Sequence, residues 1–590
     1  MRMWIMATLG LLVTAMALPA QTRDVIVEVD ANTRALLEAA AQPPVAPPTL
    51  PVTPALPGSV PLLAPAPAPV APPAVTMLPG TVVPATVPAQ PYYTGSVPYD
   101  FAKVPKDLRS PLPRAGWFGI PPSGPGFYSV YDQLRGDWKE AAPKYPLPPF
   151  TTSSLSFFNL DYSYLDDPKY TPDFLDSLKR VRLGDHWMFS TGGQAWIRYE
   201  NQYNSRLTQT DNIFTIYRAR PYADLWYEDK FRFFVEGMFA NSVWQDLPTG
   251  PNDTDRADFQ NLFMDFKLFD YKDHPVYARV GRQEAAFGSQ RLIATPDWAN
   301  TRQTFDGVRV LRTGEKWDTD LFWLSPRITT NKNGPNGHDN NVNLFGAWAT
   351  YKPKKGTTRD LYFIIDDNVN RVTQQGIQRF PATSYTFGGR AAGDVDGGFL
   401  YDVELAMQLG TRGKQDIVAG MATAAVGYHW ADTPWNPTLW ASYDYASGDH
   451  TPNGGSSANT FNQIYPFGHY YFGWIDVVGR QNIHDVSFSS WLYPTKWLTC
   501  WAQFHNFWLD SNKDALYNAS GNAIRRDATG KAGNFVGNEL DLIFNFHLTK
   551  RADVLTGYSY LWGGEFLQKT SSKTLAADTS LYYLGYSYRW

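Results

Sequence analysis

The chain has 590 residues and a formal net charge of −4 at neutral pH. So small a charge on so long a chain argues against a nucleic-acid partner, since binding to phosphates needs a basic surface. The only cysteine, Cys500, excludes an intramolecular disulfide and a cysteine-based metal cluster. Beyond the N-terminus, no apolar run reaches the roughly 18 residues of a membrane-spanning helix.

Residues 1–20 are predicted to be a secretory signal peptide. Arg2 supplies the positive charge, residues 5–18 form the apolar stretch, and Leu18-Pro19-Ala20 offers a cleavage site. The alternative is an N-terminal membrane anchor, but the apolar stretch is short for a spanning helix. The signal peptide predicts that the mature chain leaves the cytoplasm.

Two further segments precede the regular part of the chain. Residues 21–91 are rich in Pro and Ala, and such composition favours an extended periplasmic spacer over a helix or a sheet. We interpret this spacer as a passive linker, with a partner-binding role as the alternative. Residues 92–179 mix Gly and Pro with many aromatic residues. They predict either an ordered plug or cap or an extension without order, and the sequence does not decide between them.

From residue 180 to residue 590, apolar and polar residues alternate with a period of two. The last strand shows this most clearly: Tyr582, Leu584, Tyr586, Tyr588 and Trp590 form an apolar face. The residues between them are mostly small or polar, which predicts a β-strand with one apolar and one polar face. A soluble protein seldom leaves such an aromatic strand at its terminus, whereas a barrel in a lipid bilayer has reason to do so.

Runs of this kind predict about 18 strands of about 10–15 residues each between residues 187 and 590. Short turns tend to alternate with long polar connections, and the long ones are expected near 245–257, 289–303, 328–340, 370–381, 449–480, 512–534 and 566–577. The predicted fold class is therefore all-β: a transmembrane antiparallel β-barrel of the outer membrane, preceded by a signal peptide and a Pro-rich extension. A soluble propeller or solenoid would need an internal repeat, and none is visible. The connection 449–480 is long and aromatic enough to fold into the pore, but the sequence does not settle this.

Residues 281–309 carry the most specific motifs of the chain. These are Gly281-Arg282-Gln283-Glu284, Asp297-Trp298-Ala299-Asn300-Thr301-Arg302 and Asp306-Gly307-Val308-Arg309. Over roughly residues 180–590 the chain resembles the alginate-export family of outer-membrane porins. The resemblance implies a monomeric barrel of about 18 strands with an arginine-lined pore that passes an anionic polysaccharide. Residues 21–175 have no counterpart in the well-known alginate exporters. The resemblance therefore supports membership of this porin family more strongly than it supports alginate as the solute.

A pore for a polyanion needs cations that stay charged where water is scarce, and arginine meets both needs. By strand parity, the residues predicted to line the substrate path are Arg198, Arg218, Arg220, Arg232, Arg279, Arg309, Lys267, Glu200, Asp224, Glu236 and Asp265. A second set is expected at strand ends and in a loop near one mouth: Arg282, Glu284, Arg291, Arg302 and Asp306. In the alternative interpretation, the inward arginines only brace the lumen by pairing with acids. Nine arginines against six of these acids leave a surplus that favours a mildly anion-selective wall.

The sequence contains no HExxH, GxSxG or P-loop pattern, so we predict no enzyme, no metal site and no cofactor. The predicted function is an outer-membrane channel for passive passage of anionic or polyhydroxylated solutes, with polysaccharide export as one form of it. The alternative is a structural or adhesion protein that is anchored by a barrel with a plugged lumen. Predicted partners are an anionic polysaccharide or small anionic solute, outer-membrane lipid, and the barrel-assembly machinery, which would recognise Trp590.

Overall fold

The computed structural model describes residues 99, 100, 130, 134, 156–160, 162–166, 168 and 172–590, apart from 331–333, 355, 371–378, 396–397, 431–432, 453, 496 and 550. The chain divides into two units, residues 1–92 and 93–590, and the described residues all belong to the second. The predicted signal peptide 1–20, the spacer 21–91 and most of the extension 92–179 lie outside the described residues.

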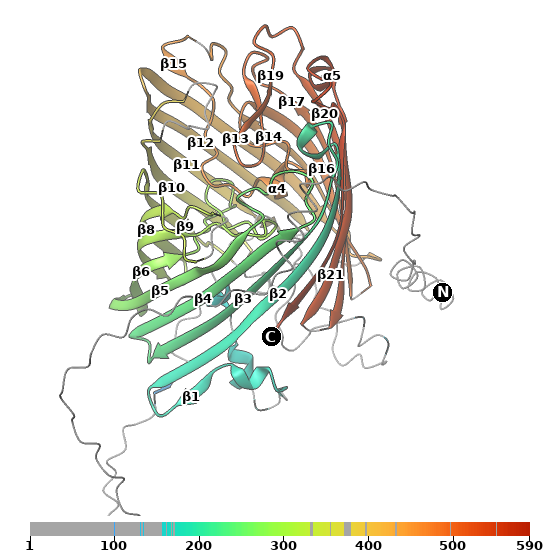
Figure 1. The fold of residues 1–590 in the computed structure, drawn as a ribbon. Coiled ribbons are helices and arrows are strands. Elements are labelled where there is room, and N and C mark those ends of the chain that lie inside the picture. Colours follow the sequence, from blue (N-terminus) through green and yellow to red (C-terminus); the bar gives the residue numbers. More distant parts are fainter. Residues whose placement is uncertain are drawn as a thin grey trace, which may run out of the picture. The chain divides into compact units, whose positions relative to one another are not determined.

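Eighteen antiparallel strands of the described chain form one closed sheet (Figure 1). In chain order, the first nine are β2 (Trp187–Tyr203), β3 (Asn212–Tyr227), β4 (Phe231–Val243), β5 (Asp255–Tyr271), β6 (His274–Gln283), β7 (Phe305–Thr313), β8 (Trp317–Pro326), β9 (Val342–Tyr351) and β10 (Thr358–Asn368). The other nine are β11 (Ala382–Val395), β12 (Phe399–Arg412), β13 (Gln415–His429), β14 (Thr438–Ala446), β16 (Ile483–Thr495), β17 (Leu498–Trp508), β20 (Phe535–Thr549), β21 (Ala552–Gly563) and β22 (Thr579–Arg589).

The sheet closes at β2, which pairs with β3 on one side and with the last strand, β22, on the other. Gln194 in the middle of β2 therefore lies opposite Arg220 of β3 and Arg589 of β22. Closure removes both sheet edges, so every strand finds hydrogen-bond partners within the sheet. The predicted antiparallel barrel and its strand number are confirmed.

Shorter elements lie between or before these strands. The short strands are β1 (Val181–Leu183), β15 (Ser457–Ala458), β18 (Ala515–Tyr517) and β19 (Ala523–Arg526). The helical turns are η3 (Phe157–Asn159), η4 (Ser163–Asp166), η5 (Asp176–Leu178), η6 (Ser205–Leu207), α4 (Gly468–Tyr471) and α5 (Glu565–Lys569). Among the described residues, helices long and apolar enough for a membrane span are absent.

The two ends of the barrel differ in the length of their connections. One end carries brief turns such as 228–230, 272–273 and 314–316, whereas the other carries long connections such as 284–304, 447–482 and 509–534. The turn 413–414 between β12 and β13 is the short exception at the second end. β1 and the C-terminal residue Trp590 both lie at the end with the short turns, because β2 starts there and β22 finishes there.

The outer face of the barrel is apolar and the inner face is polar. On β5, Leu262, Met264, Phe266 and Leu268 point outward and expose 37–51% of their surface, while Asn261 and Asp265 are buried. A band of exposed apolar side chains on every side is the surface that a lipid bilayer covers. Cys500 lies on β17 at an outward position, beside the buried Trp501.

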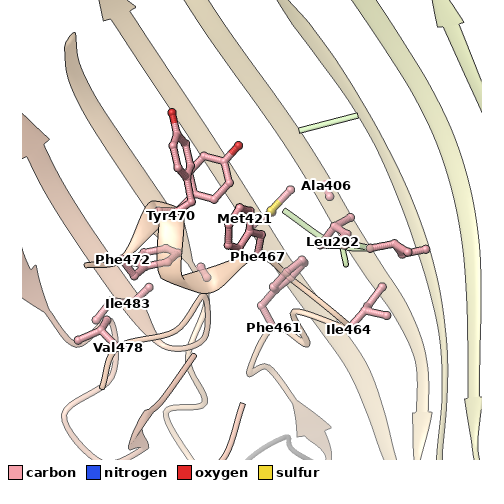
Figure 2. Packing of buried hydrophobic residues seen from close by; sticks show 14 of the residues in the cluster. Leu292, Ala406, Met421, Phe461, Ile464, Phe467, Tyr470, Phe472, Val478 and Ile483 are labelled. Atoms are coloured by element: carbon pink, nitrogen blue, oxygen red, sulfur yellow. The ribbon is translucent and has the colours of Figure 1, made fainter. Parts of the chain in front are cut away.

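Connections fold into the interior and give the barrel an apolar core. Phe461, Phe467, Phe472 and Val478 of the connection 447–482 belong to one buried apolar cluster with Met421 of β13, and Figure 2 shows Phe467 beside Met421. This apolar cluster also contains Leu292 from the connection 284–304 and Ala406 from β12. The question that the sequence left open for 449–480 is therefore answered: the connection enters the lumen, and α4 lies inside the barrel (Figure 1).

Candidate functional site: the inner wall of the barrel

The residues predicted by strand parity to face the lumen lie on the inner face. They are Arg198, Arg218, Arg220, Arg232, Arg279, Arg309, Glu200, Asp224, Glu236, Asp265 and Lys267. On β2, for example, Arg198 is buried, while its neighbours Ile197 and Tyr199 point outward. Lys267 lies nearest to a turn, where it pairs with Asp229 at 2.6 Å and Asp270 at 2.9 Å.

The five residues expected near one mouth fall into two groups. Arg282 and Asp306 do lie at strand ends, 2.6 Å apart, but on the same outward side as Val280. Glu284, Arg291 and Arg302 are instead buried inside the barrel. Their position differs from the expectation because the connection 284–304 turns inward, and a loop has no periodicity from which its direction could be read.

Each of the nine arginines lies 2.6–3.0 Å from a carboxylate oxygen. The pairs are Arg198–Glu200, Arg218–Asp297, Arg220–Glu236, Arg232–Asp224, Arg279–Asp265, Arg282–Asp306, Arg291–Asp402, Arg302–Glu284 and Arg309–Asp320. The prediction that arginines outnumber their acidic partners is wrong. Asp297, Asp320 and Asp402 supply three further carboxylates, so each arginine has one. Pairing of every arginine supports the interpretation that these side chains brace the lumen.

Asp297 of the connection 284–304 lies among several guanidinium groups. Arg218 approaches its carboxylate at 2.9 Å and Arg220 at 3.5 Å, and Arg302 also contacts it. Burial alone would raise the pKa of Asp297, but the positive charges of Arg218, Arg302 and Arg220 outweigh burial and lower this pKa. The carboxylate therefore stays ionised at neutral pH and fastens the connection to the wall.

The same connection reaches across the lumen to β12. Arg291 donates to Asp402 at 3.0 Å and to Glu404 at 2.7 Å, and Ser289 donates to Glu404 at 2.5 Å. Since β12 lies far from β6 around the barrel, these contacts cross-link two distant parts of the wall. The two acids lie about 110 residues further along the chain, so this pairing could not be predicted from strand periodicity.

A cavity of about 600 Å³ lies between the inward connections and strands β2, β3 and β22. Arg198, Trp298, His469, Trp474 and Asp476 are among its lining residues. The Trp298 and His469 rings stack with centroids 4.2 Å apart, and the Arg198 guanidinium lies 3.6 Å from the Trp298 centroid. Aromatic rings beside charged and amide side chains form a surface suited to solutes with both hydroxyl groups and charge.

Two acids on β20 hold the connection 447–482 in place. The main-chain amide of Trp474 donates to Asp541 at 3.3 Å, and that of Ile475 donates to Glu539 at 3.1 Å. Gly473 adopts a φ of +87°, and a Cβ at this position would collide with the Glu539 carboxylate. The alternation of β20 predicts that both acids face inward, but it does not reveal that main-chain amides cover them.

The described part of the N-terminal extension also contacts the inner wall. Phe157 and Phe158 are buried in one cluster with Tyr222, Phe234 and Phe263 of strands β3, β4 and β5. The aromatic character of residues 92–179 indicated contacts of this kind but not their location.

The described chain lacks any group of three or more His, Cys, Asp or Glu side chains that could hold a metal ion. A closed barrel with an apolar outer band, a charged inner wall and loops in its lumen defines the class of outer-membrane channels. The model of the alginate export family matches residues 188–579, and the chain belongs to this family. It is a protein of the outer membrane, and its family points to a transport channel rather than an enzyme.

Solved structures of Pseudomonas aeruginosa barrels are similar to the chain at low identity. OpdO is 12% identical, with 68% of this chain and 97% of OpdO covered and a TM-score of 0.44. OccK5 (OpdH) is 10% identical, with 68% and 98% covered and a TM-score of 0.46. OccK8 (OprE) is 11% identical, with the same coverage and a TM-score of 0.43. None of the curated proteins compared with the chain matches it.

Proposed function

We propose that this protein is a passive channel for anionic or polyhydroxylated solutes, and that polysaccharide export is the form of transport it serves. The observation that carries the proposal is the cavity of about 600 Å³ beside the arginine-bearing wall of β2 and β3. Arg198 and Arg302 both line it, and Trp298 lies between the wall and the connection 447–482.

The chemistry of the lining favours solutes that combine hydroxyl and carboxylate groups. Arginines remain charged in a poorly hydrated lumen, and their planar guanidinium groups bind carboxylates bidentately. Their pairing with acids leaves the wall nearly neutral overall, so hydroxyl-rich solutes meet alternating donors and acceptors. Membership of the alginate export family supports an anionic polysaccharide as one solute.

The proposal is tested by ion selectivity in planar bilayers across a KCl gradient. The variant R198Q removes a cation from the inner wall beside the cavity, and R282Q removes a cation from the outward side as the control. We expect the inner variant to shift the reversal potential and to weaken block by uronate oligomers, while the outer variant leaves both unchanged. Identical reversal potentials and identical block in all three proteins would contradict a solute path along this wall.

A second candidate function is a barrel-anchored structural or adhesion protein with a closed lumen. The burial of Phe157 and Phe158 against the inner wall favours this candidate, because these residues occupy space that a solute would need. The two candidates differ in one readout: a structural protein predicts no measurable conductance even after the N-terminal extension is removed.

We also propose that the protein is a monomer and that the barrel-assembly machinery recognises its terminal strand. Trp590 follows β22, and its main-chain amide donates to Gly193 of β2 at 3.1 Å. The aromatic end of the chain thus lies at the seam where the barrel closes, which is the last pairing to form if assembly proceeds along the chain. Residues 1–20 and 21–91 remain a predicted signal peptide and a predicted periplasmic spacer.

A further inference from the structure

We infer that residues 156–160 and 172–180, called the plug segment below, bind a specific slot on the inner wall and close the channel until they are displaced. The slot comprises Tyr222, Phe234 and Phe263 together with the three arginines Arg220, Arg232 and Arg279. The inference rests on the proposed function, since it concerns access to the same arginine-bearing wall.

Two adjacent aromatic residues fill the slot. The ring of Phe157 stacks on Tyr222 with centroids 5.0 Å apart. The ring of Phe158 meets Phe234 edge-on at 5.7 Å and Phe263 at 5.2 Å. Edge-on and offset contacts at these distances are favourable arrangements for aromatic pairs, so the slot fits a peptide with two consecutive aromatic side chains.

The plug segment also covers cations that were predicted to line the substrate path. The Arg220 guanidinium lies 4.5 Å from the Phe157 ring centroid, and that of Arg279 lies 4.6 Å from Phe158. Arg232 donates to the main-chain oxygen of Phe158 at 2.9 Å. The guanidinium faces that could meet an anionic solute are therefore occupied by the chain itself.

A second set of contacts fastens the segment at the end of the barrel with the short turns. Arg551, in the turn between β20 and β21, donates to Asp173 at 2.6 Å and to Asp176 at 2.7 Å. Lys179 donates to the main-chain oxygen of Trp590 at 3.1 Å and to the Tyr222 hydroxyl at 3.2 Å. Short turns face the periplasm in outer-membrane barrels, so the segment enters the lumen from the periplasmic side.

The arginines of the slot keep their carboxylate partners when the plug segment leaves, and this makes the segment displaceable. Arg232 already binds Asp224 through two hydrogen bonds of 2.7 Å, and Arg279 binds Asp265 through bonds of 2.7 and 2.9 Å. Departure of the segment thus leaves no unpaired charge on these strands. Phe174, within the same segment, exposes 79% of its surface, so only part of the segment is packed against the wall.

The test compares single-channel conductance of the full-length protein with that of F157A/F158A and F174A. The double variant empties the aromatic slot, and F174A removes an exposed aromatic side chain from the same segment as the matched control. A second variant, D173N/D176N, weakens the contacts with Arg551. Heat-modifiable migration on gels verifies in each case that the barrel has folded.

We expect a several-fold rise in open probability for F157A/F158A, a smaller rise for D173N/D176N and no change for F174A. Unchanged gating in both of the first two variants would overturn the plug, even if the wild-type channel is open and anion-selective. A channel that opens in F157A/F158A but shows no preference for anions would support the plug while contradicting the proposed solute. The experiment therefore distinguishes a result that contradicts the plug from a result that contradicts the proposed function.

Discussion

Two of the segments that lie in the lumen of this barrel, the connection 447–482 and the plug segment, are held in different ways. The connection 447–482 contributes many residues to the main apolar cluster, and its main-chain amides cover buried acids of β20. The plug segment inserts two aromatic residues, donates the Ser156 hydroxyl to the buried Glu284, and makes its other side-chain ion pairs at one mouth. The first is part of the folded core, whereas the second resembles a ligand supplied by the chain itself. Both segments lie in the lumen, so position alone does not tell a fixed element from a movable one. The difference is the number of apolar contacts and main-chain hydrogen bonds that hold each segment.

The largest effect is expected where a third lumenal segment, the connection 284–304, is cross-linked to β12 by Arg291. In R291A, buried Glu404 would lose its ion pair with Arg291, whereas Asp402 would keep Arg390 at 2.8 Å. Breaking a buried pair in this way costs about 3–5 kcal/mol. Denaturant unfolding of the refolded protein in detergent measures this loss. The control is R206A, because the Arg206 side chain is 51% exposed and lies 3.9 Å from its carboxylate partner; its cost should stay below about 0.5 kcal/mol.

A smaller but more local effect is expected at Gly473. Its φ of +87° disfavours any side chain, and a Cβ would strike the Glu539 carboxylate. We expect G473A to cost about 1–3 kcal/mol of unfolding free energy and to increase conductance, because the connection 447–482 must move. The matched control is G454A in the same connection, where an added Cβ meets nothing within 4 Å. Equal behaviour of the two variants would show that the clamp on Glu539 and Asp541 is unimportant.

The plug variant F157A/F158A should hardly change the stability of the barrel. An intramolecular ligand adds RT ln(1 + K) to stability, and a displaceable one with K near ten adds only about 1.4 kcal/mol. Thermal and denaturant unfolding of the barrel therefore should shift little, in contrast to its gating. A loss of about 3–5 kcal/mol, as for a phenylalanine removed from a core, would place the plug segment in the same category as the connection 447–482.

The smallest effect concerns pH. Burial first, and then the nearby charge of Arg551, lowers the pKa of Lys179 from 10.5 to about 8, against an opposing contribution of Asp176. Between these two values the released segment binds more protons than the docked one, so docking becomes more favourable as pH rises from about 8 to 10.5. Open probability should fall over this range in the wild type and stay flat in K179M. A rise in the open probability of the wild type over the same pH range would contradict the proposed role of Lys179 in docking the plug segment.

The barrel wall could be predicted from the sequence because lipid on one side and a polar lumen on the other impose a period of two. Arg198 and Arg220 face inward for the same reason that Ile197 faces lipid, and strand parity alone identifies them. Strand parity also predicts that Arg279 and Asp265 face inward, and the two residues pair across neighbouring strands.

The contents of the lumen could not be predicted in the same way. Arg291 finds Asp402 on a distant strand only because a loop without periodicity turns inward. Asp297 is part of a motif that was visible in the sequence, but its role as a shared partner of Arg218 and Arg302 depends on that same turn. Phe157 and Phe158 lie in a region of poor periodicity, where composition indicates aromatic contacts without saying what they meet.

The contrast between the two lumenal segments is tested most directly by hydrogen–deuterium exchange of the refolded full-length protein. We predict that main-chain amides of residues 472–482 exchange as slowly as those of the barrel strands. Amides of residues 156–160 and 172–180 should exchange faster, and faster still in F157A/F158A, while residues 472–482 remain unchanged. Equal and slow exchange of both segments in both proteins would contradict the account, because it would make the plug segment a fixed part of the core.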